Sequence, residues 1–237
     1  MPHDGVTQSA AFQDSRFCAT CHQFPNDGPR TAGKLREDTW RQWRASEFAQ
    51  RGEHCQSCHM PDRKHQWHGV HSAELIRQAL AVDLRIDNGV VTAIMTNVGA
   101  GHYLPTYMVA KITAGLRLAM ADGSIVDLAE DIIGWHVDVT LEHEYFDTRI
   151  PPGSSRQLSA PLPLVPAEGA RVELRIHVAP REHYERTYLS VLRQAEHLDP
   201  ETLRLLKQAY REAVKTHFEA FTVSISVPPL PAQEQRP

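Results

Sequence analysis

Two short motifs contain every cysteine in this chain. Each has the pattern Cys-x-x-Cys-His, first in FCATCHQF and again in GEHCQSCHMPD. The residues are Cys18, Cys21 and His22, and Cys55, Cys58 and His59. In both copies the spacing places two thiols close together, with an imidazole immediately after the second one.

Three kinds of chemistry use paired thiols in this way. The four cysteines could close two disulfides in an exported protein, or they could hold one zinc ion. Neither arrangement requires a histidine after each pair. Covalent haem attachment does require it, because the two sulfurs form thioethers with one porphyrin and the next imidazole binds the iron. Two complete copies therefore favour two molecules of haem c, with His22 and His59 as proximal iron ligands.

Each haem iron has a further axial position, and a histidine there favours electron transfer at low potential. The chain has 14 histidines, and three of them lie in a seven-residue stretch that follows the second motif. They are His65, His68 and His71, and two irons need partners, so we expect a distal ligand among them. His54 directly precedes Cys55, which makes ligation of the iron at its own motif geometrically awkward.

Another candidate distal ligand lies in a glycine-rich loop. The stretch TNVGAGHYLPTY places His102 after Gly99 and Gly101 and before Pro105. We expect the two glycines to let the backbone turn sharply and to leave room for a flat ring. His102 is therefore a candidate for the second side of one haem.

Covalent haem attachment takes place outside the cytoplasm, so we expect a periplasmic, cell-surface or extracellular protein. The N-terminal MPHDGVTQSAAF lacks the basic start and apolar core of a signal peptide. No apolar run is long enough to span a bilayer, so we expect no transmembrane segment. The net charge of −4 over 237 residues argues against a nucleic-acid partner.

Residues 1–80 are predicted to form a region of helices and loops around the two motifs. Within it, Trp40, Trp43 and Phe48 recur at nearly helical spacing, and Gly52 is suited to ending that helix. We expect one helix that leads into the second motif, with its aromatic side chains against porphyrin or core.

The period of the apolar residues changes to two from residue 81 onwards, which predicts an antiparallel β-sandwich over 81–237. A turn at Asn88-Gly89 predicts a hairpin, and a helical insertion is expected at about 184–219, with Asp199 as its cap. The fold class is therefore α+β. The expected strands are 81–86, 90–97, 112–120, 125–129, 135–141, 156–162, 171–178 and 221–227.

Several longer stretches resemble bacterial multihaem c-type cytochromes of the cytochrome c554-like group. They are DTWRQWRASEFAQRGEHCQSCHMPD, HQWHGVHS and TNVGAGHYLPT, with DTRIPPGSSR similar to a loop of the β-sandwich that often follows such haem modules. The resemblance implies close-packed, bis-histidine haems that relay electrons. It implies His71 and His102 as distal ligands, with His65 as the alternative. Relatives commonly hold four or more haems, whereas this chain has motifs for two.

These features predict a dihaem cytochrome that transfers single electrons between redox partner proteins, with no catalytic residues of its own. An alternative is a haem enzyme or ligand sensor, with one open iron position for a small nitrogen oxide, peroxide or gas. A third hypothesis is a subunit of a homo-oligomer or surface assembly, in which haems stack across interfaces.

Overall fold

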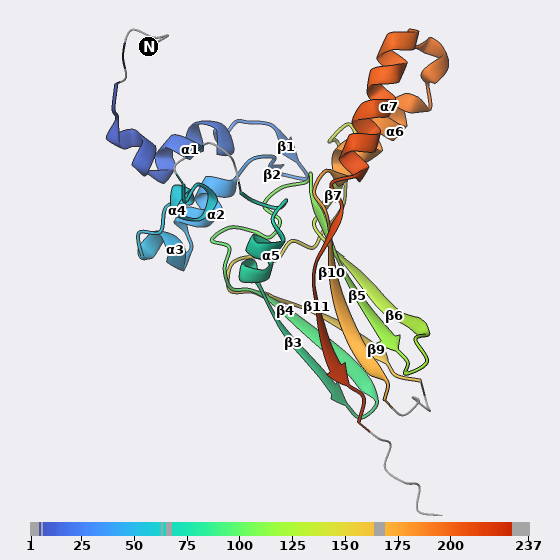
Figure 1. Cartoon of the computed structure of the whole chain (residues 1–237). Coiled ribbons are helices and arrows are strands. Elements are labelled where there is room, and N and C mark those ends of the chain that lie inside the picture. The colour runs from blue at the N-terminus through green and yellow to red at the C-terminus, as the bar shows by residue number, and fades with distance from the viewer. Residues whose placement is uncertain (1–4, 6, 63, 65–67, 164–168, 229–237) are drawn as a thin grey trace, which may run out of the picture.

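The structure, a computed structural model, describes residues 5, 7–62, 64, 68–163 and 169–228. Its N-terminal part consists of short helices around a two-stranded ribbon (Figure 1). These elements are a 3₁₀ turn at Ala10–Gln13, α1 at Ser15–His22, β1 at Arg30–Thr31, β2 at Lys34–Leu35, α2 at Thr39–Arg44, α3 at Glu47–Gln50, α4 at Cys55–His59 and α5 at Ala73–Ala79.

The remaining chain forms antiparallel sheets. One sheet has the order β11-β10-β5-β6, another has the order β3-β4-β9, and β7 pairs with β8 in a small ribbon. The strands are β3 at Leu80–Asp87, β4 at Val90–Asn97, β5 at Lys111–Ala119, β6 at Ile125–Ile133, β7 at Trp135–Val137, β8 at Glu144–Asp147, β9 at Ser155–Pro161, β10 at Arg171–Ala179 and β11 at Phe218–Ser226. Helices and antiparallel sheets are both present, as the α+β class requires.

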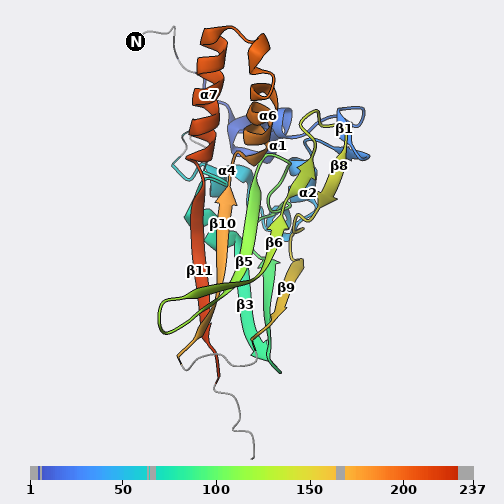
Figure 2. The same cartoon turned by 90° about the vertical axis from the view of Figure 1, so that its right-hand side faces the viewer.

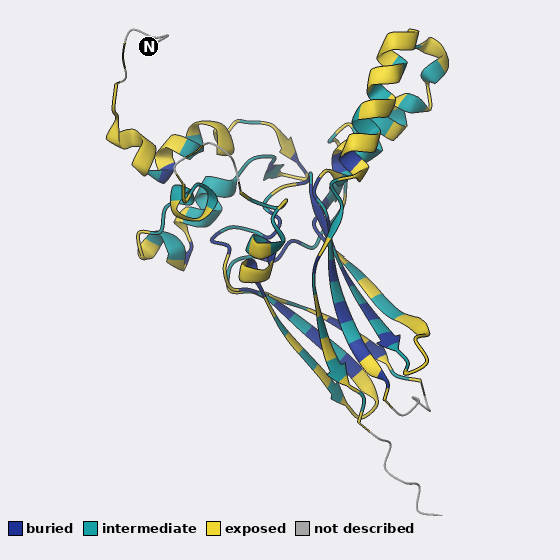
Figure 3. Ribbon diagram, viewed as in Figure 1, coloured by how far each residue is buried: buried dark blue, intermediate teal, exposed yellow. Residues whose placement is uncertain are grey.

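One apolar core lies between the two larger sheets. Alternate residues of the central strands are fully buried, including Val91 and Met95 on β4, Leu116 on β5 and Leu174 on β10. Figure 3 shows this alternation as dark bands across the strands. Burying one such side chain contributes about 1.5–3 kcal/mol, so the period-two pattern supplies most of the force that joins the sheets.

The predicted hairpin at Asn88-Gly89 is confirmed. Asn88 and Gly89 have φ angles of +49° and +75°, and Asp87 pairs with Val90 across the turn. This is the conformation that matches the twist of two antiparallel strands, and asparagine and glycine adopt it at little cost. The strand pairing around this turn then places one face of β4 in the core.

The predicted helical insertion is correct in position, but its C-terminal boundary at 219 is wrong. The structure has α6 at Glu182–Leu192, a 3₁₀ turn at Ala195–His197 and α7 at Pro200–Val214. The Asp199 side chain caps α7 as expected, accepting hydrogen bonds from two backbone N–H groups. The boundary moves because Phe218 already belongs to β11, where it pairs with Val178 of β10.

The single helix expected through Trp40 and Phe48 is two helices, α2 and α3. The break is at Ser46, which is buried and has an extended backbone, with its hydroxyl donating to the Trp43 carbonyl at 2.6 Å. A serine that bonds to the preceding backbone in this way competes with helix continuation. Gly52 follows α3 with φ of +72°, as predicted for a helix end.

Both groups of helices lie at the same end of the strands. Figures 1 and 2 agree that α1 to α4 and the α6–α7 hairpin lie beyond one end of the sheets, while the strands run away from them. The helix α5 lies against the sheets, where Arg77 donates a hydrogen bond to the Ala220 carbonyl of β11 at 3.0 Å. In the part of the chain that the structure describes, no helix has both the length and the apolar character needed to cross a membrane.

Candidate functional site

The two Cys-x-x-Cys-His motifs each occupy a short helix. The first coincides with the second half of α1, which Asp14 caps by accepting a hydrogen bond from the Arg16 N–H at 2.7 Å. The second forms α4, with Cys55 at its first position and His59 at its last. A helical turn puts both thiols of a motif on neighbouring positions and ends at the imidazole.

The helices α1 and α4 are in direct contact through a buried serine. Ser15 is fully buried, and its hydroxyl accepts a hydrogen bond from the Cys55 N–H at 3.0 Å. Gln56 of α4 donates to the Phe12 carbonyl at 2.8 Å, just before α1. Burial, together with the nearby Cys55, raises the pKa of the Cys18 thiol. The two motifs therefore face a common space.

All four cysteines of the two motifs are free thiols in the structure. Among the described residues, no group of three or more His, Cys, Asp or Glu side chains is arranged to hold a metal ion.

His54 has a structural role at the contact between the helices. Its Nδ1 accepts a hydrogen bond from the Ser15 N–H at 3.3 Å, and its ring lies on Trp43 with centroids 5.8 Å apart. Accepting at Nδ1 assigns the proton to Nε2, which is the wrong tautomer for binding a metal through Nε2. This agrees with the expectation that His54 does not bind the iron at its own motif.

His59 and His102 face each other across the site. Their ring centroids are 6.0 Å apart, and their planes differ by 17°. A metal–imidazole bond is about 2 Å long, and the ring centre lies about 1 Å behind the nitrogen, so two histidines on one ion have centroids about 6 Å apart. The observed centroid spacing is close to this value.

Hydrogen bonds at the other nitrogen orient both rings. His59 Nδ1 lies 2.5 Å from the His68 carbonyl oxygen, and His102 Nδ1 lies 2.8 Å from the Tyr103 carbonyl oxygen. A carbonyl can only accept, so each Nδ1 carries the proton and each Nε2 carries the lone pair. Metal-binding histidines are typically held in this manner.

Burial keeps these two imidazoles neutral. It lowers the pKa of His59, and it lowers the pKa of His102 to about 4. The hydrogen bond from each ring to a carbonyl opposes this effect but does not reverse it. Neutral imidazole is the form that binds a metal, so neither ring must lose a proton at pH 7 to do so.

The loop that carries His102 approaches two other segments closely. The backbone bends at both glycines, as expected, although neither has a left-handed conformation. Their role is close approach. A Cβ on Gly99 would lie 2.3 Å from the Gln78 carbonyl oxygen, and one on Gly101 would lie 3.1 Å from Trp43.

Both motifs and His102 line one cavity of about 520 Å³. This volume lies in the range of about 300–1,000 Å³ that is common for cofactor sites. The walls are mainly apolar and aromatic, as a porphyrin face requires. The lining includes Cys18, His22, Cys55, Cys58, His59, His71 and His102, with Trp40, Trp43, Phe48, Leu75, Ile76, Leu104, Val109, Tyr107 and Tyr184.

A buried donor in the cavity wall has no acceptor among the described residues. The indole N–H of Trp40 is buried without a hydrogen-bond partner, and leaving such a group unpaired costs about 1–3 kcal/mol. A haem has apolar faces and two carboxylates, so it could fill the apolar space and also supply an acceptor. The residues present therefore fit this group.

Comparisons with known proteins gave a match in structure but not in sequence. No protein-family model and no curated protein sequence matches the chain. The crystal structure of a penta-haem cytochrome c552 from Thermochromatium tepidum matches with a TM-score of 0.60 and 17% sequence identity. This chain shares its fold with part of that cytochrome. The match covers 91% of this chain but 56% of the cytochrome, so this chain spans little more than half of its length. A structural-genomics target also matches, with 11% identity over 67% of this chain and 94% of the target, but its TM-score of 0.28 supports no argument.

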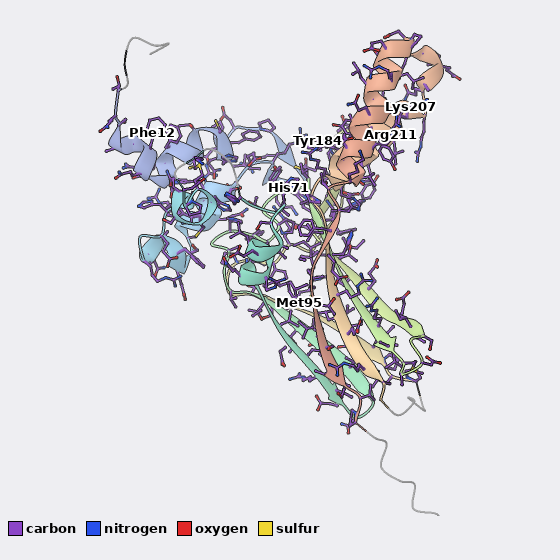
Figure 4. All side chains as sticks on the ribbon, viewed as in Figure 1. Phe12, His71, Met95, Tyr184, Lys207 and Arg211 are labelled. Atoms are coloured by element: carbon purple, nitrogen blue, oxygen red, sulfur yellow. The ribbon has the colours of Figure 1, made fainter. Side chains whose placement is uncertain are left out.

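The other predicted ligands have different settings. His22 ends α1, is exposed and lines the cavity. His71 also lines the cavity, and Figure 4 shows it near the junction of the helical part with the base of the α6–α7 hairpin, where Tyr184 lies. Burial, and then the charge of Arg181, lower the pKa of His71. The alternative ligand His65 lies outside the described residues.

Three cavity residues had no signal in the sequence. Tyr184 and Arg181 lie near the start of α6, and Val109 precedes β5, yet all three reach the same space as the motifs. No local spacing relates them to a Cys-x-x-Cys-His motif. They come close to it because both groups of helices lie at the same end of the sheets.

Proposed function

We propose that the chain is a dihaem c-type cytochrome that passes single electrons between redox partner proteins. The observation that carries this proposal is the pairing of His59 with His102. Their two neutral imidazoles have ring centroids 6.0 Å apart, which leaves room for one metal ion between them. One of these histidines belongs to a haem-attachment motif. The other comes from a distant loop and lies on the same cavity.

In this proposal each motif holds one haem through two thioethers. Cys18 and Cys21 attach the first haem, and His22 is its proximal ligand. The second haem is attached through the thiols of α4, with His59 as proximal ligand and His102 as distal ligand. When bound, each haem supplies an iron that gains and loses one electron.

The protein residues then restrict the chemistry to electron exchange. The carbonyls that accept from His59 and His102 hold the imidazoles in place whether the iron is oxidised or reduced, so little reorganisation accompanies the electron. Trp40, Trp43 and Phe48 give that side of the cavity an aromatic wall. Because α1 and α4 are in contact through Ser15, both haems are attached to one rigid unit.

The iron at the first motif is proposed to take His71 as its distal ligand, with His65 as the alternative. This assignment rests on the position of His71 in the cavity lining. We also propose that residues 1–80 form the haem module and that residues 81–237 form a β-sandwich domain that supports it. Attachment through thioethers implies a periplasmic or extracellular location. Assembly with further copies or with a partner would extend a relay of two haems.

A second candidate function is ligand binding at the first haem. The observation in its favour is that no hydrogen bond to another described residue orients the His71 ring, in contrast to His102. Arg181, Tyr107 and Tyr184 line the same cavity and could stabilise a small polar ligand beside an iron that His71 releases.

The two candidates are separated by one set of measurements. The chain is expressed with a cytochrome c maturation system, and the intact mass is expected to increase by two haems. The reduced protein should then show low-spin spectra that carbon monoxide does not change. A colourless product, or one that carries zinc, would overturn the haem proposal. Binding of carbon monoxide to one haem of the two would favour the second candidate.

A further inference from the structure

The loop that carries His102 is tied to the β-sandwich at both of its ends. It begins where β4 ends, at Asn97, and it runs to Thr106 before β5 starts. It also carries one residue of the candidate ligand pair. The position of the His102 imidazole therefore depends on what holds this loop.

Asn97 closes the first half of the loop with its side chain. The residue is 1% exposed. Its Nδ2 donates to the His102 carbonyl and to the Ile150 carbonyl, each at 2.9 Å, and its Oδ1 accepts from the Ala100 N–H at 3.0 Å. One amide thus joins the residue that carries the ligand, the inside of the loop and a neighbouring segment.

The backbone of Asn97 is held as well. Its N–H donates to the Ser154 carbonyl at 3.0 Å, and its carbonyl accepts from the Gly153 N–H at 2.8 Å. The backbone from which the Asn97 side chain extends is therefore fixed to the segment before β9.

The second half of the loop is held by the segment Arg149–Ile150. Leu104 and Ile150 exchange two backbone hydrogen bonds, both of 3.0 Å. The Arg149 guanidinium donates to the Thr106 carbonyl at 2.6 Å and lies over the Tyr103 ring, 5.1 Å from its centroid. The residues on either side of His102 are thus restrained from the side of the sheets.

We propose that Asn97 is a positioning residue for the distal haem ligand, which holds His102 at its distance from His59 before any haem is attached. This inference rests on the proposed function, because it concerns the histidine that would bind the second iron. It goes beyond that function by placing the control of axial ligation in the β-sandwich, five residues before the ligand in sequence and on a different element.

The chemistry of the side chain explains why an amide is suited to this position. Two acceptors and one donor face it, and asparagine has two N–H donors and one carbonyl acceptor. Aspartate has the same shape and keeps the acceptor, but it loses both donors and places a negative charge against two carbonyl oxygens. The variant Asn97→Asp therefore tests the hydrogen bonds with little change in volume.

The experiment compares the haem-loaded wild type with Asn97→Asp and Asn97→Ala. In both variants we expect one of the two haems to lose its low-spin spectrum and to bind carbon monoxide, while the intact mass still shows two attached haems. Hydrogen exchange at the Ala100 amide should become faster as well, and this readout does not depend on the haem signal.

Leu174→Ala is the matched control. Leu174 is fully buried in β10 but makes none of the loop hydrogen bonds, so its variant tests the effect of lost stability with those hydrogen-bonding groups still present. Low-spin spectra in Leu174→Ala, together with altered spectra in both Asn97 variants, would support the positioning role. Equal spectral changes in all three would assign the effect to stability alone and overturn it.

The outcomes also separate this inference from the proposed function. If the wild type carries two low-spin haems and both Asn97 variants keep them, with unchanged exchange at Ala100, the positioning role is wrong and the cytochrome assignment stands. If the wild type attaches no haem, the proposed function is wrong, and the role of Asn97 in haem ligation is wrong with it.

Discussion

A buried carboxyl beside the haem region offers the sharpest test of the electrostatics. Glu37 lies just before α2, and its Oε2 is buried with no hydrogen-bond partner among the described residues. Burial raises its pKa from 4.5 to about 7. Among the described residues, no cation offsets the effect of this burial on the pKa of Glu37. The side chain therefore stays protonated in the folded protein at pH values where the unfolded chain has already ionised.

The sign of the effect follows from proton binding. Between pH 4.5 and about 7 the folded state holds a proton that the unfolded state has released, so the free energy of unfolding decreases as the pH rises. The difference in pKa corresponds to about 3 kcal/mol. Partial access of solvent to the side chain reduces this to about 1–2 kcal/mol.

The variant Glu37→Gln removes the ionisation and keeps the shape. We expect it to be more stable than the wild type by about 1–2 kcal/mol at pH 8 and nearly equal to it at pH 5. Urea unfolding of the haem-loaded protein, followed by circular dichroism at both pH values, measures this difference. Glu74→Gln, at an exposed position on α5, is the control and should change stability little at either pH.

The result that would refute this reasoning is a difference between Glu37→Gln and the wild type that does not change with pH. It would mean that Glu37 has a similar pKa in the folded and unfolded states, and that water or another group reaches its buried oxygen.

Three further predictions concern the attachment sites and the ligand loop. Replacing Cys55 and Cys58 by alanine should leave one haem on the chain, as measured by the mass of the intact protein. A mass that shows two haems would contradict the assignment of that motif. His102→Met should raise the reduction potential of one haem, since methionine ligation favours the reduced iron, and an unchanged titration would exclude His102 as a ligand. Gly99→Ala should cost about 1–3 kcal/mol in thermal unfolding, because the new Cβ would lie 2.3 Å from a backbone oxygen. The control is Gly115→Ala, because a Cβ added at Gly115 would have no neighbouring atom within 4 Å. An equal loss of stability in Gly115→Ala would argue against a clash at Gly99.

The strands were predictable because their evidence is local. Alternation of apolar residues along β4, β5 and β10 gave nearly the observed bounds, and Asn88-Gly89 located the turn. Each strand buries one face, so apolar and polar residues alternate along consecutive positions of the sequence. The short strands β1, β2 and β8 were missed, because two to four residues are too few to show a period.

The break between α2 and α3 was not predictable from spacing. Trp40, Trp43 and Phe48 have nearly the period of one helix, but Ser46 turns back to bond the Trp43 carbonyl and is buried. The energy that stabilises this break comes from packing against other segments. A Cβ on Gly101, for example, would lie 3.0 Å from the Ser46 hydroxyl.

The sequence by itself predicted haem attachment at the two motifs. Two thiols and an imidazole fall within one helical turn in each motif, so no knowledge of the fold is needed to see what they can bind. It also identified His71 and His102 as candidate distal ligands, with His65 as the alternative, because these histidines lie near the second motif or in a shaped loop. It left open which histidine faces which motif.

Only the tertiary structure decided that His59 and His102 face each other, with ring centroids 6.0 Å apart. The two residues lie on separate elements, and hydrogen bonds from Asn97 and Arg149 hold the loop that carries His102. The Trp40 indole N–H and Glu37 Oε2 are buried with no hydrogen-bond partner among the described residues, and this was equally invisible in the sequence. Such features depend on the sum of many contacts between distant segments, which no short pattern of residues records.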